Sequence, residues 1–361
     1  MKIGMVAPPW VPVPPKAYGG TELVVDALCV SLQRAGHEVT LFTTADSTCA
    51  VRRRHLFAHS DPDRMGSAVL ELRHVAAAYD ELEQMDIIHD HTLAGMFYRD
   101  APNVPVVVTN HGPFNADLAD LYGRVAGRIP VIAISRDQAS RAPDGLPIAA
   151  VIHHGLLLDR YPFAEHPADH LLFLGRMSPD KGIDSAIRTA RRAGTPLLIA
   201  AKMREANEVR YFEETIRPML SRSVRYIGEA DFASKVRLLS SARALINPIQ
   251  WPEPFGLVMA EALACGTPVV GYPGGAAPEI VDHGVTGFLV DDEDELVDAV
   301  SRIDQINRGV CREVAEEKFT AARMAADHLR LYRDVIGKWG SRHSNLPTSE
   351  DTLTRSLLAL H

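Results

Sequence analysis

The chain has 361 residues, of which 46% are hydrophobic and 23% charged, and its formal net charge is −8. This length suggests two domains, each with enough apolar surface to form a large buried core. The acidic balance argues against a nucleic-acid-binding protein, which usually carries a basic face. It also gives no support for a strongly basic membrane-docking surface, so peripheral membrane contact has no basis in composition.

Compartment and redox state follow from the N-terminal segment and the cysteines. Residues 1–6 carry one charge and too short an apolar run before Pro8 for a signal peptide, and no run approaches the 18 or so apolar residues of a membrane span. None of the four cysteines belongs to a C-x-x-C pair, so we expect buried apolar residues in a reducing compartment. These features predict a cytoplasmic protein.

Short apolar runs alternate with helical stretches through the first half of the chain. The runs are continuous, as in strands of a parallel sheet that is buried on both faces. The clearest helix spans 21–35, with Thr21 as its N-cap and Gly36 as its stop. This alternation predicts a doubly wound α/β domain. The predicted strands are residues 2–7, 38–43, 86–89, 105–110, 131–135 and 149–153.

The same pattern restarts after a polar, proline-containing linker at 159–167. We therefore predict two Rossmann-like domains, 1–165 and 166–320, with a ligand cleft between them at the carboxyl ends of both sheets. A final helix over 321–339 and a polar tail ending in a short amphipathic piece complete the chain, and we expect 321–361 to pack on the N-terminal domain. The second set of predicted strands is 170–175, 196–201, 224–228, 244–248, 268–272 and 288–290.

Two glutamates flank the start of a predicted helix at 255–264, directly after one of these strands. The first N–H groups of a helix are unpaired and suit an anionic ligand. Glu261 lies within the helix among apolar neighbours, so its carboxylate needs partners, which ligand hydroxyls would supply. Glu253 lies at the strand-to-helix turn, where ligands bind in such sheets. A solvated edge position for Glu261 and an exposed turn for Glu253 are the alternatives.

Two cations and two glycines lie in other turns that also follow predicted strands. Arg176 and Lys181 follow the first strand of the second domain, where a forked guanidinium and a mobile ammonium would hold a diphosphate. A solvated helix position is the alternative for Lys181. Gly19 and Gly20 follow the first strand of the chain and permit close approach of a ligand to the backbone. The dinucleotide fingerprint G-x-G-x-x-G is absent, which disfavours an NAD-dependent dehydrogenase.

Several histidines lie at strand ends. His89 and His91 have a spacing that would suit two metal ligands, but no third ligand is evident, and we predict no metal site. Polar contacts in the cleft are expected for His91 and for His111, and structural roles for His153 and His154.

Two short charged motifs carry less weight. Residues 61–63 have a D-x-D spacing but lie in a polar loop, and the basic run 52–54 is interpreted as a solvated loop.

Together, in this order, these motifs resemble the GT-B glycosyltransferases and, within them, the retaining family 4. The resemblance covers residues 1–339, and its most specific part is the pair of glutamates in Glu253-Pro-Phe-Gly-Leu-Val-Met-Ala-Glu261, supported by Gly-Arg-Met-x-x-x-Lys-Gly at 175–182. It implies two Rossmann-like domains facing each other across a cleft. It also implies transfer of a hexose-type sugar from a nucleotide diphosphosugar, UDP-linked by preference and GDP-mannose next, to a hydroxyl acceptor without a cofactor.

The resemblance also implies a role for each matching residue. Arg176 and Lys181 neutralise the donor diphosphate, Glu253 contacts the donor sugar and Glu261 binds the ribose. The remaining implied positions line the donor or lie near the transferred sugar: Gly19, Gly20, Phe255, Gly256, Leu257 and His111.

The sequence departs from the family pattern at Lys202 and Met203, where relatives carry small residues in the wall on the nucleotide side. Substrate specificity would arise from the loops 8–18, 110–120 and 274–277, which do not identify the acceptor. Rival functions are a nucleotide-sugar epimerase or a sugar phosphorylase on the same scaffold, and a non-catalytic module that binds a nucleotide sugar.

Overall fold

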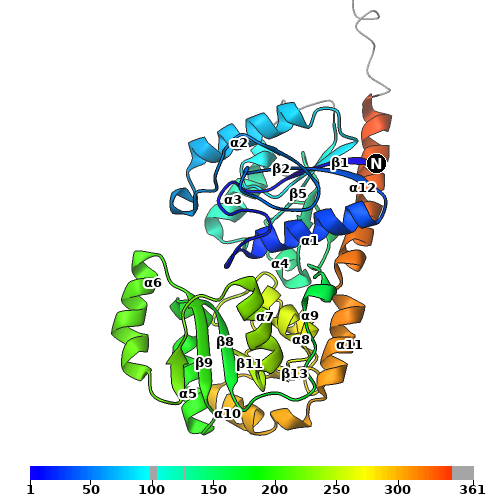
Figure 1. Cartoon of the computed structure of the whole chain (residues 1–361). Coiled ribbons are helices and arrows are strands. Elements are labelled where there is room, and N and C mark those ends of the chain that lie inside the picture. The colour runs from blue at the N-terminus through cyan, green and yellow to red at the C-terminus, as the bar shows by residue number, and fades with distance from the viewer. Residues whose placement is uncertain (98–103, 126, 344–361) are drawn as a thin grey trace, which may run out of the picture.

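The computed structural model describes residues 1–97, 104–125 and 127–343, and it contains two parallel sheets with helices packed on them (Figure 1). Strand order in the N-terminal sheet is β3-β2-β1-β4-β5-β6-β7. Its strands are β1 (Lys2–Val6), β2 (Glu38–Thr43), β3 (Arg52–His55), β4 (Ile87–Asp90), β5 (Val106–Thr109), β6 (Val131–Ala133) and β7 (Ile148–Val151).

The second sheet repeats this topology with the order β10-β9-β8-β11-β12-β13. In both sheets the strand order reverses beside the first strand of the unit. The reversal lies between β1 and β4 in the first sheet and between β8 and β11 in the second. Ligands of doubly wound folds bind at such a switch point. The strands are β8 (Leu171–Arg176), β9 (Leu197–Lys202), β10 (Val224–Tyr226), β11 (Ala244–Asn247), β12 (Val269–Gly271) and β13 (Gly287–Leu289). The predicted fold class, two doubly wound α/β units, is confirmed.

Helices connect the strands and cover the sheets, which lie one above the other in Figure 1. In the first unit they are α1 (Gly20–Arg34), α2 (Ala68–Glu81), α3 (Ala116–Arg124) and α4 (Arg136–Ser140). In the second they are α5 (Ile183–Arg192), α6 (Ala206–Tyr211), α7 (Phe232–Ser241), α8 (Leu257–Ala264), α9 (Ala277–Ile280), α10 (Glu293–Ser301) and α11 (Arg308–Lys318).

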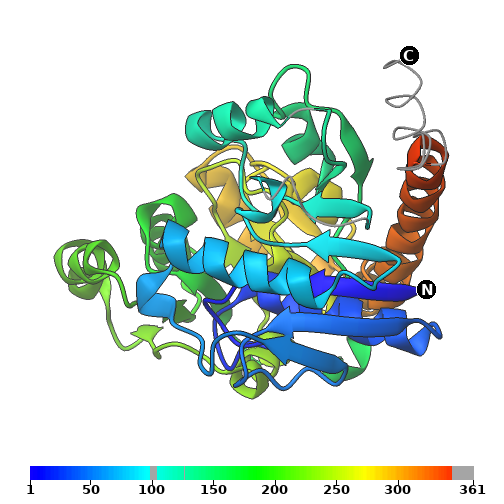
Figure 2. The same cartoon turned by 90° about the horizontal axis from the view of Figure 1, so that it is seen from above.

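The last helix, α12 (Ala321–His343), runs along one side of the N-terminal sheet in both orientations (Figures 1 and 2). Met324, Leu329 and Tyr332 belong to the same buried core as Leu28 of α1. The segment that leads into α12 lies beside Leu156, in the segment that joins the first sheet to the second. Leu156 N–H donates to Phe319 O at 2.8 Å, and Ala321 N–H donates to Leu156 O at 2.8 Å. The exact domain boundaries stay a prediction. The sequence predicts a tail that begins after Gly340, but α12 continues to His343, and the remaining residues 344–361 lie outside the described residues.

Three predicted local structures are wrong. Thr21 is not the N-cap of α1, because the helix begins at Gly20 and its N-cap is Gly19. The basic run 52–54 is not a loop but part of β3, which pairs in parallel with β2 at the edge of the sheet. Charged side chains on an edge strand hinder pairing with other chains, and they hide the strand from an apolar pattern. The helix after Glu253 begins at Leu257 rather than at residue 255, because Gly256 adopts a left-handed conformation with φ of 89°.

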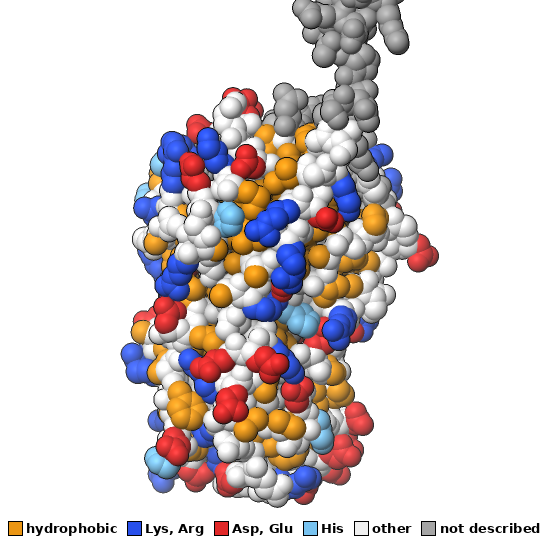
Figure 3. Space-filling model, turned by 90° about the vertical axis from the view of Figure 1, so that its right-hand side faces the viewer, with side chains coloured by type: hydrophobic (Ala, Val, Ile, Leu, Met, Phe, Trp, Pro, Cys, Tyr) orange, Lys and Arg blue, Asp and Glu red, His pale blue; other side chains and the backbone are white. Residues whose placement is uncertain are grey.

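The surface beside α12 carries charges of both signs with apolar side chains between them (Figure 3). All four cysteines are buried and free, as expected. None of the helices in the described ranges combines the length and apolarity that a bilayer crossing demands.

Candidate active site

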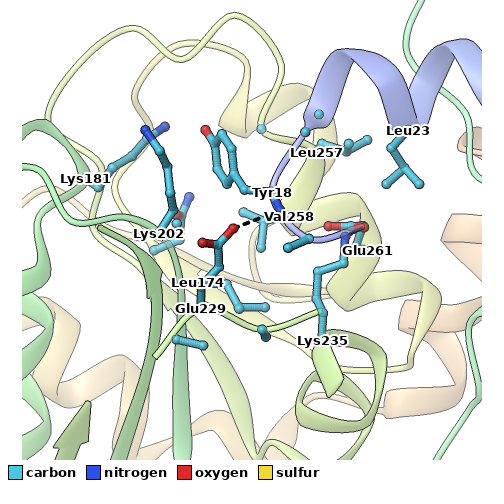
Figure 4. Close-up of a pocket in the computed structure, with 18 of the residues that line it drawn as sticks. Tyr18, Leu23, Leu174, Lys181, Lys202, Glu229, Lys235, Leu257, Val258 and Glu261 are labelled. Carbon is cyan, nitrogen blue, oxygen red and sulfur yellow. Dashed lines mark hydrogen bonds and ion pairs between the residues drawn. The ribbon is translucent and has the colours of Figure 1, made fainter. Parts of the chain in front are cut away.

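The carboxyl ends of the two sheets enclose a cavity of about 200 Å3 (Figure 4). Residues 17–20, which follow β1 and open α1, form one wall. The opposite wall comes from the turns after β8 and β11 and from α8. The segments that carry the predicted site residues therefore meet at the two switch points.

Lys181 and Glu253 form an ion pair in this cavity, with Nζ 2.5 Å from Oε2. Only 13% and 18% of the two side-chain surfaces is exposed, and the Lys181 ammonium also lies 5.1 Å from the centre of the Trp251 ring. Gly182 positions the lysine, because its φ of 72° belongs to the left-handed region and a Cβ there would overlap the carbonyl oxygen of Pro248. The turn after β8 thus packs on the end of β11.

Glu261 is buried on α8, with 4% of its side chain exposed. Its Oε1 lies 2.5 Å from Lys235 Nζ and accepts a hydrogen bond of 2.9 Å from the Tyr161 hydroxyl. The expectation that this carboxylate needs partners is confirmed, and the structure supplies them from the protein. Burial, and secondly the charge of Glu261, raise the pKa of Tyr161. Sequence analysis missed Lys235 and Tyr161, since neither belongs to a motif and both meet Glu261 only in the fold.

Arg176 stands apart from Lys181. Its guanidinium donates to Asp180 at 3.2 Å, about a third of its side chain is exposed, and it is not among the residues that line the cavity. Its charge still reaches Tyr18. Burial raises the pKa of Tyr18 to about 12, and the positive charge of Arg176 opposes that rise. The predicted cation pair is therefore near the cleft, but only Lys181 lines it.

The loop with Gly19 and Gly20 has little room for a side chain at Gly19. A Cβ on Gly19 would lie 2.7 Å from Pro15 Cβ, and a Cβ on Gly20 would lie 3.9 Å from Leu257 Cδ2 of α8. The first contact excludes any larger residue at position 19. The second shows that the N-terminal end of α1 faces the start of α8 across the cavity.

Two further residues, Glu229 and Lys202, line the smaller cavity although the sequence predicted no role for them there. The Glu229 carboxylate accepts a hydrogen bond of 3.2 Å from Tyr18 N–H and is paired with Arg204 at 2.8 Å. Lys202, where the sequence departs from the family pattern, lines the cavity and is paired with Glu205 at 2.7 Å and Glu208 at 3.2 Å. Both side chains are thus held in place by charged partners from the second α/β unit.

A second cavity of about 510 Å3 adjoins the first and shares Gly19, Gly20 and Glu253 with it. His111 lines this larger cavity, and so do Phe255, Gly256 and Leu257. Burial lowers the pKa of His111 to about 3, so this imidazole is neutral at pH 7. All of the predicted sugar-side residues therefore border one connected space.

A hydrogen-bonded chain fixes the tautomer of His111. His91 Nε2 lies 3.0 Å from Met5 Sδ, and His91 Nδ1 lies 2.8 Å from His111 Nε2. A thioether only accepts, so His91 carries its proton on Nε2 and His111 donates from its own Nε2. The Nδ1 lone pair of His111 then remains as an acceptor on the side away from His91.

Of the other histidines at strand ends, His89 and His153 have partners in the protein, whereas His154 borders the larger cavity. Both ring nitrogens of His89 are engaged, with the Tyr332 hydroxyl at 2.7 Å and Thr109 Oγ1 at 2.7 Å. His153 Nε2 lies 2.8 Å from Glu279 Oε2, while His154 stacks on His111 and lines the larger cavity. Within the described residues, no group of three or more His, Cys, Asp and Glu side chains is arranged to hold a metal.

Comparison with known families matches both halves of the chain. Residues 18–160 match the model described as glycosyltransferase family 4, and residues 168–305 match the model described as glycosyl transferases group 1. A curated relative, phosphatidyl-myo-inositol mannosyltransferase of Mycolicibacterium smegmatis, is 27% identical over 93% of this chain and 95% of its own length.

Solved structures share the fold over nearly the whole chain. AviGT4, a glycosyltransferase involved in avilamycin A biosynthesis, has a TM-score of 0.70 at 25% identity and covers 93% of this chain and 98% of its own. Anabaena Alr3699/HepE in complex with UDP and glucose has a TM-score of 0.71 at 20% identity, with 92% and 100% covered. The resemblance deduced from the two glutamates is thus confirmed. The chain belongs to glycosyltransferase family 4, enzymes of the GT-B fold that transfer a sugar from a nucleotide-sugar donor.

Proposed function

We propose that this enzyme transfers a hexose, with retention of configuration, from a UDP-sugar or, as the next candidate, GDP-mannose to an acceptor hydroxyl. The mannosyltransferase relative and the HepE structure with UDP and glucose support the two donor candidates. We place the acceptor side in residues 1–165 and the donor side in 166–320. The reaction is expected to proceed in the cytoplasm without a metal.

The observation that carries this proposal is the Lys181–Glu253 pair opposite Gly19 and Gly20 in the smaller cavity. A donor diphosphate brings two negative charges to a lysine that is already desolvated, so the attraction is stronger than in water. When the Lys181 ammonium pairs with the diphosphate instead, the Glu253 carboxylate would be released to accept hydrogen bonds from sugar hydroxyls. One pair of residues would then serve both halves of the donor.

Neighbouring residues complete the donor site in this proposal. The N-terminal end of α8, at Gly256 and Leu257, supplies partial positive charge to the phosphates. Glu261 accepts from the ribose hydroxyls, and Phe255 and His111 border the sugar. Arg176 contributes once it exchanges Asp180 for a phosphate oxygen.

In the reaction the bond between the anomeric carbon and the diphosphate breaks, and its electron pair leaves with the phosphate oxygen. The acceptor oxygen forms its bond on the same face of the sugar, and its proton passes to the departing phosphate. Negative charge grows on that phosphate in the transition state, and Lys181, the α8 terminus and Arg176 stabilise it. Closure of the two domains aligns donor and acceptor.

The test is release of nucleoside diphosphate from UDP-, GDP- and ADP-sugars in the presence of EDTA, for the wild type and for Glu253→Ala. Slow hydrolysis without an acceptor gives sufficient signal. We expect release from one nucleotide class and its loss in Glu253→Ala. The exposed Glu83→Ala variant is the matched control, since Glu83 lies outside both cavities.

The stereochemistry of the product, read by NMR, tests retention. Inversion of the anomeric centre would contradict the mechanism. Interconversion of the donor without release would indicate an epimerase, and dependence on inorganic phosphate would indicate a phosphorylase. Silence across the panel without a ligand-induced thermal shift would favour a non-catalytic module.

A further inference from the structure

The larger cavity, where the acceptor would bind, has an uneven distribution of charge. Glu22, Glu71 and Glu253 all line it, and no lysine or arginine does so within the described part of the chain. Glu71 is fixed there, because its Oε1 accepts hydrogen bonds from Leu93 N–H at 2.7 Å and Ala94 N–H at 3.1 Å. The remaining wall is largely apolar. It includes Trp10, Val11, Met65 and Leu93.

Glu22 is the unusual member of this set. It lies in the first turn of α1 with 6% of the residue exposed, beside the Gly19 backbone. Among the described residues, no other side chain donates a hydrogen bond to its carboxylate. Burial raises the pKa of Glu22 to about 7, against the opposing effect of its own backbone N–H. A buried carboxyl group whose donor is its own backbone N–H alone is costly, and a ligand that brings further donors lowers that cost.

Glu253 is paired with Lys181, so the negative character of the described wall comes from Glu22 and Glu71, for which no such cationic partner is present among the described residues. Burial lowers the pKa of His111 to about 3 and also lowers that of His154, so neither imidazole supplies a cation at neutral pH. The positive end of the α1 dipole already has the Glu22 carboxylate in its first turn. An anionic group placed in this cavity would therefore meet like charge at low dielectric.

Resting on the transferase function proposed above, we infer that the acceptor is a polyhydroxylated compound with no phosphate or carboxylate, whose hydroxyl or ammonium donors bind Glu22. The apolar wall, with the indole of Trp10, would pack on the C–H face of a sugar or cyclitol ring. Glu22 is thus assigned to acceptor binding, a role that no motif in the sequence indicated.

The experiment compares matched compounds at pH 8, where Glu22 is ionised, with the donor saturating. The pairs are glucose with glucose 6-phosphate and myo-inositol with myo-inositol 1-phosphate, and glucosamine provides the ammonium arm. Any compound that enters the cavity changes the rate of nucleoside-diphosphate release, either by accepting the sugar or by displacing water. Mass spectrometry separates glycoside from free sugar.

We expect an unphosphorylated compound to act at a concentration at least about tenfold below that of its phosphorylated partner, equivalent to about 1.4 kcal/mol. Glu22→Gln should lower the ratio between the effective concentrations of the phosphorylated and the unphosphorylated compound. Glu83→Gln should leave that ratio unchanged. A preference for glucosamine over glucose that disappears in Glu22→Gln would identify an ammonium as the donor group, and equal effects would identify hydroxyls.

Three results would overturn the inference. Stronger effects of the phosphorylated members would show an anionic acceptor, and no effect of any unphosphorylated compound up to its solubility would show that the cavity does not bind them. No release from any donor would overturn the transferase function together with this inference. If Glu22→Gln does not fold, as judged by its thermal unfolding, the wild-type pairs decide the question alone.

Discussion

Lys181 Nζ and Glu253 Oε2 lie 2.5 Å apart although 72 residues separate them in the chain. Each follows a strand beside the switch point of the second sheet, β8 for the lysine and β11 for the glutamate. In the proposed mechanism the Lys181 ammonium exchanges this carboxylate for a donor phosphate. This exchange of partners leads to the first prediction.

Lys181→Ala should lower the rate of nucleoside-diphosphate release about 10²- to 10³-fold, with most of the loss in kcat, because the ammonium stabilises charge that develops on the leaving group. Lys181→Arg should restore part of that loss. The measurement is steady-state release from the preferred donor. Lys318→Ala, which breaks an ion pair with Asp282 at 2.8 Å away from both cavities, is the control. Wild-type rates in Lys181→Ala would refute the diphosphate role.

Glu261→Gln should raise the donor KM about tenfold or more, because a hydrogen bond to a charged group contributes about 1.5–3 kcal/mol. The change also leaves Lys235 without its counterion, so we expect a lower free energy of unfolding in urea. Asp26→Asn is the matched control, since Asp26 is a buried carboxylate paired with Arg160 at 2.7 Å outside both cavities. It should lose stability without a change in donor KM. An unaltered KM in Glu261→Gln would exclude ribose binding by this residue.

Gly182→Ala should abolish activity and lower the melting temperature, because its Cβ would overlap the carbonyl oxygen of Pro248 and push the Lys181 turn away from β11. Gly194→Ala provides the comparison. Its φ of 65° is also left-handed, but nothing lies within 4 Å of the added atom. That variant should lose only about 1–2 kcal/mol from backbone strain and remain active. Equal effects of the two substitutions would contradict this account of Gly182.

Removal of divalent metals should leave the rate unchanged, because the proposed charge stabilisation relies on Lys181, Arg176 and the α8 terminus. The measurement is release from the preferred donor after dialysis against EDTA, with and without added manganese or magnesium. An enzyme that is silent in EDTA and recovers with manganese would overturn both this prediction and the proposed donor site.

Stability should fall as the pH drops below 6.5, partly through His74 in the N-terminal core. Burial lowers the pKa of His74 to about 4, although its hydrogen bond to Ala7 O opposes the shift. In the unfolded chain a histidine binds its proton near pH 6.5, so acid favours unfolding between about pH 6.5 and 4. From pH 7.5 to pH 5 this one residue should cost about 2 kcal/mol.

Other groups act in the opposite direction over the same range. Burial raises the pKa of Glu22 to about 7 and that of Asp90 to about 6, so their destabilising effect weakens as the pH falls. The contribution of His74 must therefore be read from a variant. His74→Phe, measured by urea unfolding at both pH values, should show the smaller loss, and the exposed His59→Asn should behave as wild type. Identical pH dependence in His74→Phe would disprove the assignment.

The sequence alone determined the two doubly wound sheets, because strands buried on both faces are continuous apolar runs that stand out from amphipathic helices. It also predicted that Glu253, Lys181 and the Gly19–Gly20 pair lie at one cleft, since they follow strands whose carboxyl ends face it, and all of them line the smaller cavity. The strand β3 escaped detection because Arg52–His55 are edge residues in contact with solvent, and an edge strand needs no apolar pattern.

Only the tertiary structure decided which groups meet. Lys235 and Tyr161 lie 26 and 100 residues from Glu261, and only the fold makes them its partners. It likewise separates Arg176 from the wall of the smaller cavity and buries Glu22 in the wall of the larger one, although both lie in motifs whose spacing looks ordinary. Hydrophobic periodicity records which face of an element is buried. The ion pairs and the sign of charge in a cavity depend on side chains from several elements, and no local pattern carries that information.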